Sequence, residues 1–159
     1  MSFPVEFLRP GDEIVCVFSA AFLGKNAEVY IRDAGHKRVT CVDLDAAKLE
    51  EMRPAFPNSW EFVAADAYLW MPAAPLRSCD VLVLDPWTGD MGTVMRQIGA
   101  WSMIARRLVI VGVCAAWAEE ERVGDMGLWF ADRGLTLLRF PLRSDYRGGV
   151  YWAVCEVTP

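Results

Sequence analysis

Short apolar runs alternate with segments of helical periodicity along the chain. Residues 13–18 form a continuous run rich in β-branched side chains, which predicts a buried strand. The same character predicts six more strands, over residues 38–42, 60–65, 80–84, 108–113, 135–140 and 150–157. Apolar side chains at helical spacing predict helices over residues 24–34, 46–52, 91–105 and 119–133.

Near-continuous apolar strands that alternate with helices are typical of a parallel sheet covered on both faces. The last two strands flank a polar, glycine-rich turn at residues 143–149, so we expect them to pair as an antiparallel hairpin. The predicted fold is therefore α/β: a doubly wound, mostly parallel seven-stranded sheet with helices on both faces and an antiparallel C-terminal hairpin. We expect a single domain over residues 1–159.

Composition narrows the classes of protein that this chain can belong to. Hydrophobic residues make up 54% of the 159 residues and charged residues 23%, which excludes disorder. The net charge of −5 counts against strong binding to a nucleic-acid backbone. The longest uncharged run near the middle, residues 108–118, is about half of what a membrane helix needs. Glu6 and Arg9 interrupt any signal-peptide core, so we expect a cytoplasmic protein without membrane contact.

The five cysteines lie in or beside apolar runs, and none forms a Cys-x-x-Cys pair. We interpret them as small buried hydrophobic residues in a reducing compartment. Because His36 is the single histidine, no zinc site is expected.

Three acidic residues follow successive predicted strands: Asp43, Asp66 and Asp85. Ligands of doubly wound sheets bind at the carboxyl ends of the strands, where the strand order reverses. Each acid alone is also compatible with a solvated helix cap. Asp43 follows the second strand and is placed to accept two hydrogen bonds from a ribose diol.

The order of elements, these acids and the turn Asp85-Pro86-Trp87 resemble the class I S-adenosylmethionine-dependent methyltransferases, over about residues 12–157. The resemblance implies S-adenosylmethionine as cofactor, with Asp43 on the ribose, Asp66 and Ala67 at the adenine, and the first loop at the methionine end. The implied cofactor-binding residues are Ser19, Ala20, Gly24, Asn26, Asp43, Leu44, Asp66 and Ala67.

Asp85, Pro86 and Trp87 are similar to the fourth motif of methyltransferases that act on amino nitrogen, with one proline fewer. The resemblance implies that these three residues form the catalytic site. The acceptor would be a nucleobase, a nucleotide or a small amine, whose amino group the polar side chain orients while the aromatic ring stacks on it.

The first loop departs from the glycine-rich motif of that family. Phe18 stands in the place of the acid, and Ala20 and Phe22 stand in the places of two glycines, so that only Gly24 matches. The ring of Phe22 either fills the methionine site or lines it from outside. The alternative function is therefore a catalytically inactive, methyltransferase-like binding or interaction protein that has lost the cofactor.

Seven tryptophans are many for this length. Trp101 and Trp129 lie on apolar helix faces and are expected in the core, and Trp117 is expected beside the cleft. Tyr68 and Trp70 either cover the adenine or pack in the core. Exposed tryptophans would form a surface for a homodimer or a partner chain.

Tyr146 and Arg147 lie in the turn of the last hairpin. We predict that they bind substrate, Arg147 through phosphate or carboxylate and Tyr146 through stacking. A solvated turn is the alternative.

Overall fold

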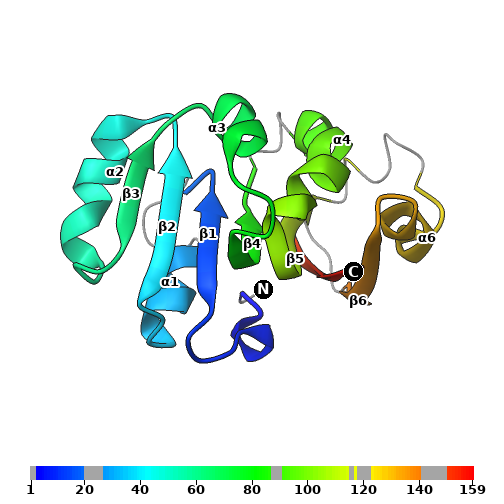
Figure 1. Cartoon of the computed structure of the whole chain (residues 1–159), viewed down its shortest axis with the longest axis horizontal. Helices are drawn as coiled ribbons and strands as arrows, with labels where there is room; N and C mark the ends of the chain where they lie inside the picture. The colour runs from blue at the N-terminus through cyan, green and yellow to red at the C-terminus, as the bar shows by residue number, and fades with distance from the viewer. Residues whose placement is uncertain (1–2, 20–26, 87–90, 115–116, 118–122, 141–149) are drawn as a thin grey trace.

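The seven strands form one twisted sheet in the computed structural model, which describes residues 3–19, 27–86, 91–114, 117, 123–140 and 150–159 (Figure 1). The strand order is β3-β2-β1-β4-β5-β7-β6. The strands are β1 (Glu13–Val17), β2 (Arg38–Asp43), β3 (Glu61–Ala64), β4 (Cys79–Leu84), β5 (Ala105–Cys114), β6 (Leu135–Arg139) and β7 (Val150–Val157). β7 pairs antiparallel with β5 and with β6, whereas the other neighbours are parallel. The predicted fold class is confirmed.

The chain runs outward in both directions from the middle of the sheet. β1, β2 and β3 follow one another toward one edge, and β4 then returns to the other side of β1. The strand order therefore reverses between β1 and β4. In doubly wound sheets a ligand binds at the carboxyl ends of the strands at this point.

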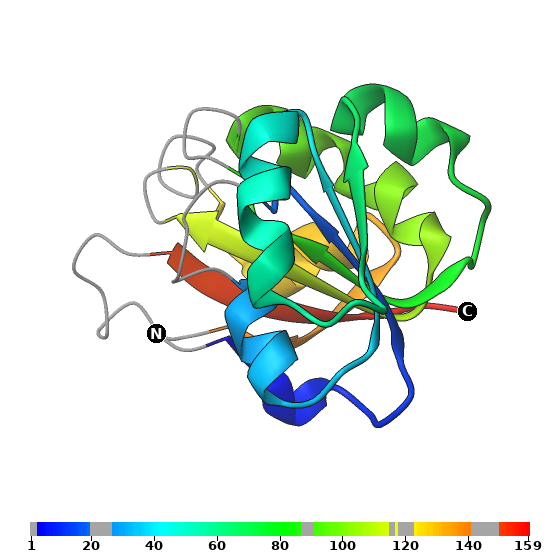
Figure 2. The ribbon, with the colours of Figure 1, turned by 90° about the vertical axis from the view of Figure 1, so that its left-hand side faces the viewer.

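Helices cover the two faces separately. α1 (Ala27–Asp33) and α2 (Ala46–Met52) pack on one face. α3 (Ala67–Ala73), α4 (Met91–Trp101) and α6 (Met126–Ala131) pack on the other. Figure 2, seen from the β3 edge, shows α1 (blue) and α3 (green) on opposite sides of the strands. Short 3₁₀ turns lie at Val5–Phe7, Arg53–Ala55 and Ser102–Ile104.

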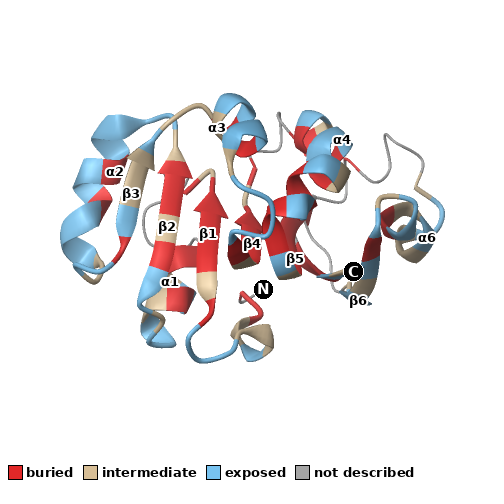
Figure 3. Ribbon diagram, in the orientation of Figure 1, coloured by how far each residue is buried: buried red, intermediate tan, exposed pale blue. Residues whose placement is uncertain are grey.

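Alternation along the central strands builds two cores. Val15 and Val17 of β1 point into the cluster under α3 and α4, and Ile14 and Cys16 point into the cluster under α1. The buried residues are concentrated on the central strands (Figure 3). A sheet buried on both faces explains why these strands read as continuous apolar runs rather than alternating ones.

Several element boundaries differ from the prediction. β1 ends one residue early, because Phe18 has a left-handed backbone (φ +68°). β5 begins at Ala105 instead of residue 108, because the charged pair Arg106 and Arg107 belongs to the strand. α4 ends at Trp101 instead of residue 105. α6 begins at Met126, where the carboxylate of Asp125 accepts a hydrogen bond from the first turn, and residues 119–122 of the predicted helix lie outside the described residues.

The sequence pattern did not predict α3. Asp66 caps it by accepting a hydrogen bond from the backbone N–H of Tyr68 at 2.9 Å. The helix has seven residues and contains Pro72, a residue that normally ends helices. A short helix with an internal proline lacks the periodicity that identified the longer helices.

The cysteines and tryptophans are mostly interior. The described cysteine side chains, Cys16, Cys41, Cys79 and Cys155, are buried and free, as predicted. Trp101 is buried as predicted, and Trp129 is half-buried against the same core. The exposed large hydrophobic side chains of the described residues include no tryptophan, so these residues do not form the expected tryptophan-rich surface. Within the described part of the chain, every helix is too short or too polar to cross a membrane.

Candidate active site

The carboxyl ends of four neighbouring strands are joined by backbone hydrogen bonds. The N–H of Asp85, just past β4, donates to the carbonyl of Val17 at the end of β1 (3.2 Å). The N–H of Ala65, just past β3, donates to the carbonyl of Asp43 at the end of β2 (2.9 Å). Because β1 and β2 are themselves paired, the acids predicted from the sequence follow adjacent strands at one edge of the sheet.

Asp43 is half-buried at the end of β2. Its Oδ1 accepts a hydrogen bond from the backbone N–H of Asp45 at 2.9 Å, which fixes the carboxylate at the start of the turn into α2. Leu44 beside it is 74% exposed. A fixed carboxylate next to an exposed apolar side chain can take a ribose diol and the face of a base.

Asp66 and Ala67 begin α3 on the other side of this edge. The Asp66 side chain is half-buried and caps the helix, whereas Ala67 is buried. Capping uses Oδ1 of Asp66. The structure therefore gives this residue the structural role that was the alternative for each acid.

Asp85 and Pro86 follow β4 directly. Pro86 is buried and Asp85 is half-buried, and burial raises the pKa of Asp85 to about 6 from its usual 3.8. A carboxylate with a pKa near 6 is still ionised at neutral pH and can accept a hydrogen bond from an amino group.

Phe18 and Ser19 form the described part of the first loop. The Phe18 ring lies 6.4 Å from the ring of Tyr68 and 6.3 Å from that of Trp101, so it is directed toward α3 and α4. Ser19 is buried, and its hydroxyl donates to the carbonyl of Cys16 at 3.0 Å. An aromatic side chain thus occupies the position at which the resembling family carries an acid.

The remaining predicted site residues lie outside the described residues. They are Ala20, Phe22, Gly24 and Asn26 of the first loop, Trp87 of the catalytic turn, and Tyr146 and Arg147 of the last hairpin. Their roles stay predictions.

Glu28 is a residue of this edge that the sequence interpretation missed. Its side chain, in the first turn of α1, is 1% exposed, and neither carboxyl oxygen has a hydrogen-bond partner among the described residues. Tyr30 stands at the helical spacing of the apolar residues Ala27 and Ile31, yet it is 38% exposed. Glu28 lies three residues before the buried Ile31, and this i, i+3 relation was the available signal.

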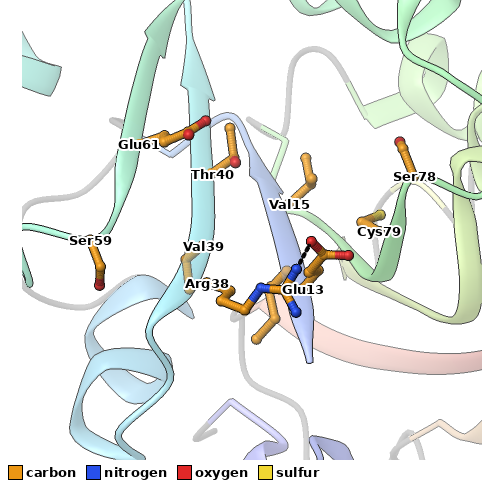
Figure 4. Close-up of a pocket in the computed structure, with 10 residues that line it drawn as sticks. Glu13, Val15, Arg38, Val39, Thr40, Ser59, Glu61, Ser78 and Cys79 are labelled. Atoms are coloured by element: carbon orange, nitrogen blue, oxygen red, sulfur yellow. Dashed lines mark hydrogen bonds and ion pairs between the residues drawn. The ribbon is translucent and has the colours of Figure 1, made fainter. Parts of the chain in front are cut away.

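The amino ends of the strands carry a different kind of site. A pocket of about 270 Å³ opens there (Figure 4), lined by Glu13, Ile14, Val15, Arg38, Val39, Thr40, Ser59, Glu61, Ser78 and Cys79. Glu13 pairs with Arg38 and with Arg106, and Arg106 also binds Asp80 at 2.8 Å. These ion pairs occupy most of the charges at this end, which lies opposite to Asp43 and Asp85. Among the described residues there is no group of three or more His, Cys, Asp or Glu that could hold a metal ion.

The fold matches solved methyltransferases. Magnesium protoporphyrin IX methyltransferase from Synechocystis PCC 6803 with bound S-adenosylmethionine superposes with a TM-score of 0.66 at 14% identity, over 94% of this chain and 71% of that one. A chain of the Haloferax volcanii complex between the Trm112 activator and a methyltransferase gives 0.65 at 13% identity, over 96% and 84%. An S-adenosylmethionine-dependent methyltransferase from Mesorhizobium loti gives 0.64 at 12%, over 92% and 91%. The chain has the fold of S-adenosylmethionine-dependent methyltransferases.

At these identities the likeness establishes the fold, as the resemblance in the sequence predicted. No protein-family model and no curated protein sequence matches the chain.

Proposed function

We propose that this protein is an S-adenosylmethionine-dependent methyltransferase that acts on an amino nitrogen of a nucleobase, a nucleotide or a small amine. The observation that carries the proposal is the position of Asp43 and Asp85. These two carboxylates follow β2 and β4, on either side of β1, at the edge where the strand order reverses. The fold shared with solved methyltransferases supports the same function.

We infer that the side chains of this edge would hold an adenosine. Asp43 would accept hydrogen bonds from the ribose hydroxyls, and the exposed Leu44 would contact a face of the adenine. Ala67 would present its backbone beside the ring, and Asp66 its second carboxylate oxygen. The cofactor supplies an activated methyl group on a sulfonium, so the protein needs to position the acceptor rather than to activate it.

Asp85 is the residue that we assign to the acceptor. Its carboxylate would accept a hydrogen bond from the amino group and orient the nitrogen lone pair toward the methyl group. The hydrogen bond from its N–H to Val17 holds the start of this turn against β1. Trp87, Tyr146 and Arg147 would complete the acceptor site by stacking and by binding an anionic group.

We also expect the protein to act in the cytoplasm. Four buried cysteines that carry free thiols support a reducing compartment.

Calorimetry with S-adenosylmethionine tests the cofactor assignment directly. We expect wild type to bind and Asp43→Ala to bind at least about 10-fold more weakly, because the ribose loses charged hydrogen bonds. Asp132→Ala is the matched control, since Asp132 is exposed beyond α6. Absence of binding to wild type would favour the inactive alternative.

Transfer of a labelled methyl group to a panel of nucleobases, nucleotides and small amines tests the reaction. Methylation at carbon or oxygen alone would contradict the assignment to amino nitrogen, while leaving cofactor binding intact.

A further inference from the structure

The Glu28 side chain is a buried carboxyl group. It lies in the first turn of α1, immediately after the first loop, and 1% of its surface is exposed. Among the described residues, neither of its oxygens has a hydrogen-bond partner and no ion pair involves it. A buried acid of this kind is expensive, so its presence calls for an explanation.

Among the described residues, the groups that interact with Glu28 are acidic or neutral. The carboxylates of Asp43 at the end of β2 and of Asp85 after β4 interact with it electrostatically, as does the thiol of Cys16 in β1. The hydroxyl of Ser19 lies nearby, but it donates to the carbonyl of Cys16. Glu28 therefore lies within electrostatic range of the two acids that we assign to cofactor and acceptor.

Burial, helped by the charges of Asp85 and Asp43, raises the pKa of Glu28 to about 8. Its own backbone N–H and the Ser19 hydroxyl lie near enough to lower the pKa, but neither forms a hydrogen bond of good geometry with the carboxyl oxygens, and together they do not offset burial. The group is thus mostly protonated at pH 7. A cation placed against it would replace the proton and supply the missing partner.

We propose that Glu28 binds the positively charged methionine end of the cofactor and releases a proton to solvent when it does so. Phe18 occupies the place of an acid in the first loop, and its ring is directed toward α3 and α4, on the opposite face of the sheet from α1. Glu28 brings a carboxyl group from α1 to the vicinity of Cys16 and Ser19, at the end of β1. The inference rests on the cofactor assignment under the proposed function and is independent of the acceptor.

Binding of three related ligands separates charge from shape. S-Adenosylmethionine carries an ammonium and a sulfonium, S-adenosylhomocysteine carries the ammonium alone, and 5′-methylthioadenosine carries neither. Calorimetry on the full chain at pH 7 compares wild type with Glu28→Gln, which keeps the size of the side chain. Glu51→Gln, an exposed acid on α2, is the control.

We expect Glu28→Gln to weaken the binding of S-adenosylmethionine about 10-fold or more, and that of 5′-methylthioadenosine less than about 2-fold. If Glu28→Gln weakens the binding of S-adenosylhomocysteine as much as that of S-adenosylmethionine, the ammonium is the partner of Glu28. If the binding of S-adenosylhomocysteine is unchanged, the sulfonium is the partner. Titration in two buffers of different ionisation enthalpy should show release of a proton by wild type that Glu28→Gln lacks.

Unchanged binding of S-adenosylmethionine by a folded Glu28→Gln variant would overturn the inference, as would equal weakening of all three ligands. Both results leave the cofactor assignment standing, provided that Asp43→Ala weakens all three. Failure of wild type to bind any of the ligands would overturn the cofactor assignment and this inference together.

Discussion

The ring of Phe18 packs against the ring of Trp101 with centroids 6.3 Å apart, although the Phe18 backbone is left-handed. The contact joins the end of β1 to the last turn of α4. A phenylalanine with φ +68° is held in an unfavourable conformation that glycine adopts readily. The aromatic contacts of this residue therefore compensate for local backbone strain.

Replacing Phe18 by alanine or by glycine separates these two effects. Both variants lose the ring, but alanine keeps the strain, so we expect Phe18→Ala to be less stable than Phe18→Gly by about 1 kcal/mol. Urea unfolding measures the difference. Gly35→Ala is a useful companion, because φ is +85° there and an added Cβ meets no atom within 4 Å. Equal stability of the two Phe18 variants would contradict the strain.

Glu28 makes the stability of the free protein fall as pH rises. Its pKa is raised to about 8 in the folded chain from about 4.5, so the folded state holds a proton that the unfolded state has lost. The contribution of Glu28 to the free energy of unfolding should be fully present below pH 4.5 and should be lost as the pH rises through 8. The slope approaches about 1.4 kcal/mol per pH unit.

Urea unfolding of wild type and Glu28→Gln between pH 5 and 9 isolates this contribution, because other groups cancel in the difference. If the free energy of unfolding changes with pH in the same way for both proteins, the pKa of Glu28 is not raised in the folded chain.

Asp85 should control the acidic limb of the methyl-transfer rate. Its pKa is raised to about 6 by burial, so protonation below that pH removes an acceptor for the amino group. We expect the wild-type rate to fall below about pH 6 and Asp85→Asn to lack this limb. Asp85→Ala should lose about 100-fold or more in rate, because the acceptor is no longer oriented.

Rate profiles at saturating cofactor test this assignment. A persistent acidic limb in Asp85→Asn would assign the titration to another group.

Arg106 should contribute to stability without affecting the site. It binds Asp80 at 2.8 Å and Glu13 at 2.5 Å, and it donates to the carbonyl of Arg77 at 2.7 Å. The pairs are partly exposed, so Arg106→Ala should cost about 1 kcal/mol, less at high salt. Binding of S-adenosylmethionine should remain unchanged, because these residues lie at the amino ends of the strands.

Arg96→Ala, on the exposed side of α4, is the control for Arg106→Ala. A weakened affinity for S-adenosylmethionine in Arg106→Ala alone would show that the two ends of the sheet are coupled.

Local signals in the sequence predicted most of the fold. The helix predicted over residues 46–52 coincides with α2 at both ends. Its first turn depends on a local contact, in which the backbone N–H of Lys48 donates to the carboxylate of Asp45. The start of β5 was missed, because Arg106 finds its partners Glu13 and Asp80 on other strands, and such partners are invisible along the chain. The prediction therefore failed where a charged side chain is satisfied by tertiary contacts.

The same distinction between local and tertiary signals applies to the residues of the candidate site. The placement of Asp43 and Asp85 at one edge could be predicted, because topology alone brings the ends of β2 and β4 together. Glu28 was missed, because a glutamate on a helix is normally solvated, and its spacing to the buried Ile31 is a weaker signal than that expectation.

β7 is the last of the seven strands along the chain, yet it lies between β5 and β6. During synthesis on the ribosome, β5 is complete long before the residues that cover its outer edge have emerged. That edge then stays open to other chains until Val150–Val157 inserts. Nascent chains stalled before residue 150 should therefore be the aggregation-prone species of this protein, whereas full-length chains should close the sheet.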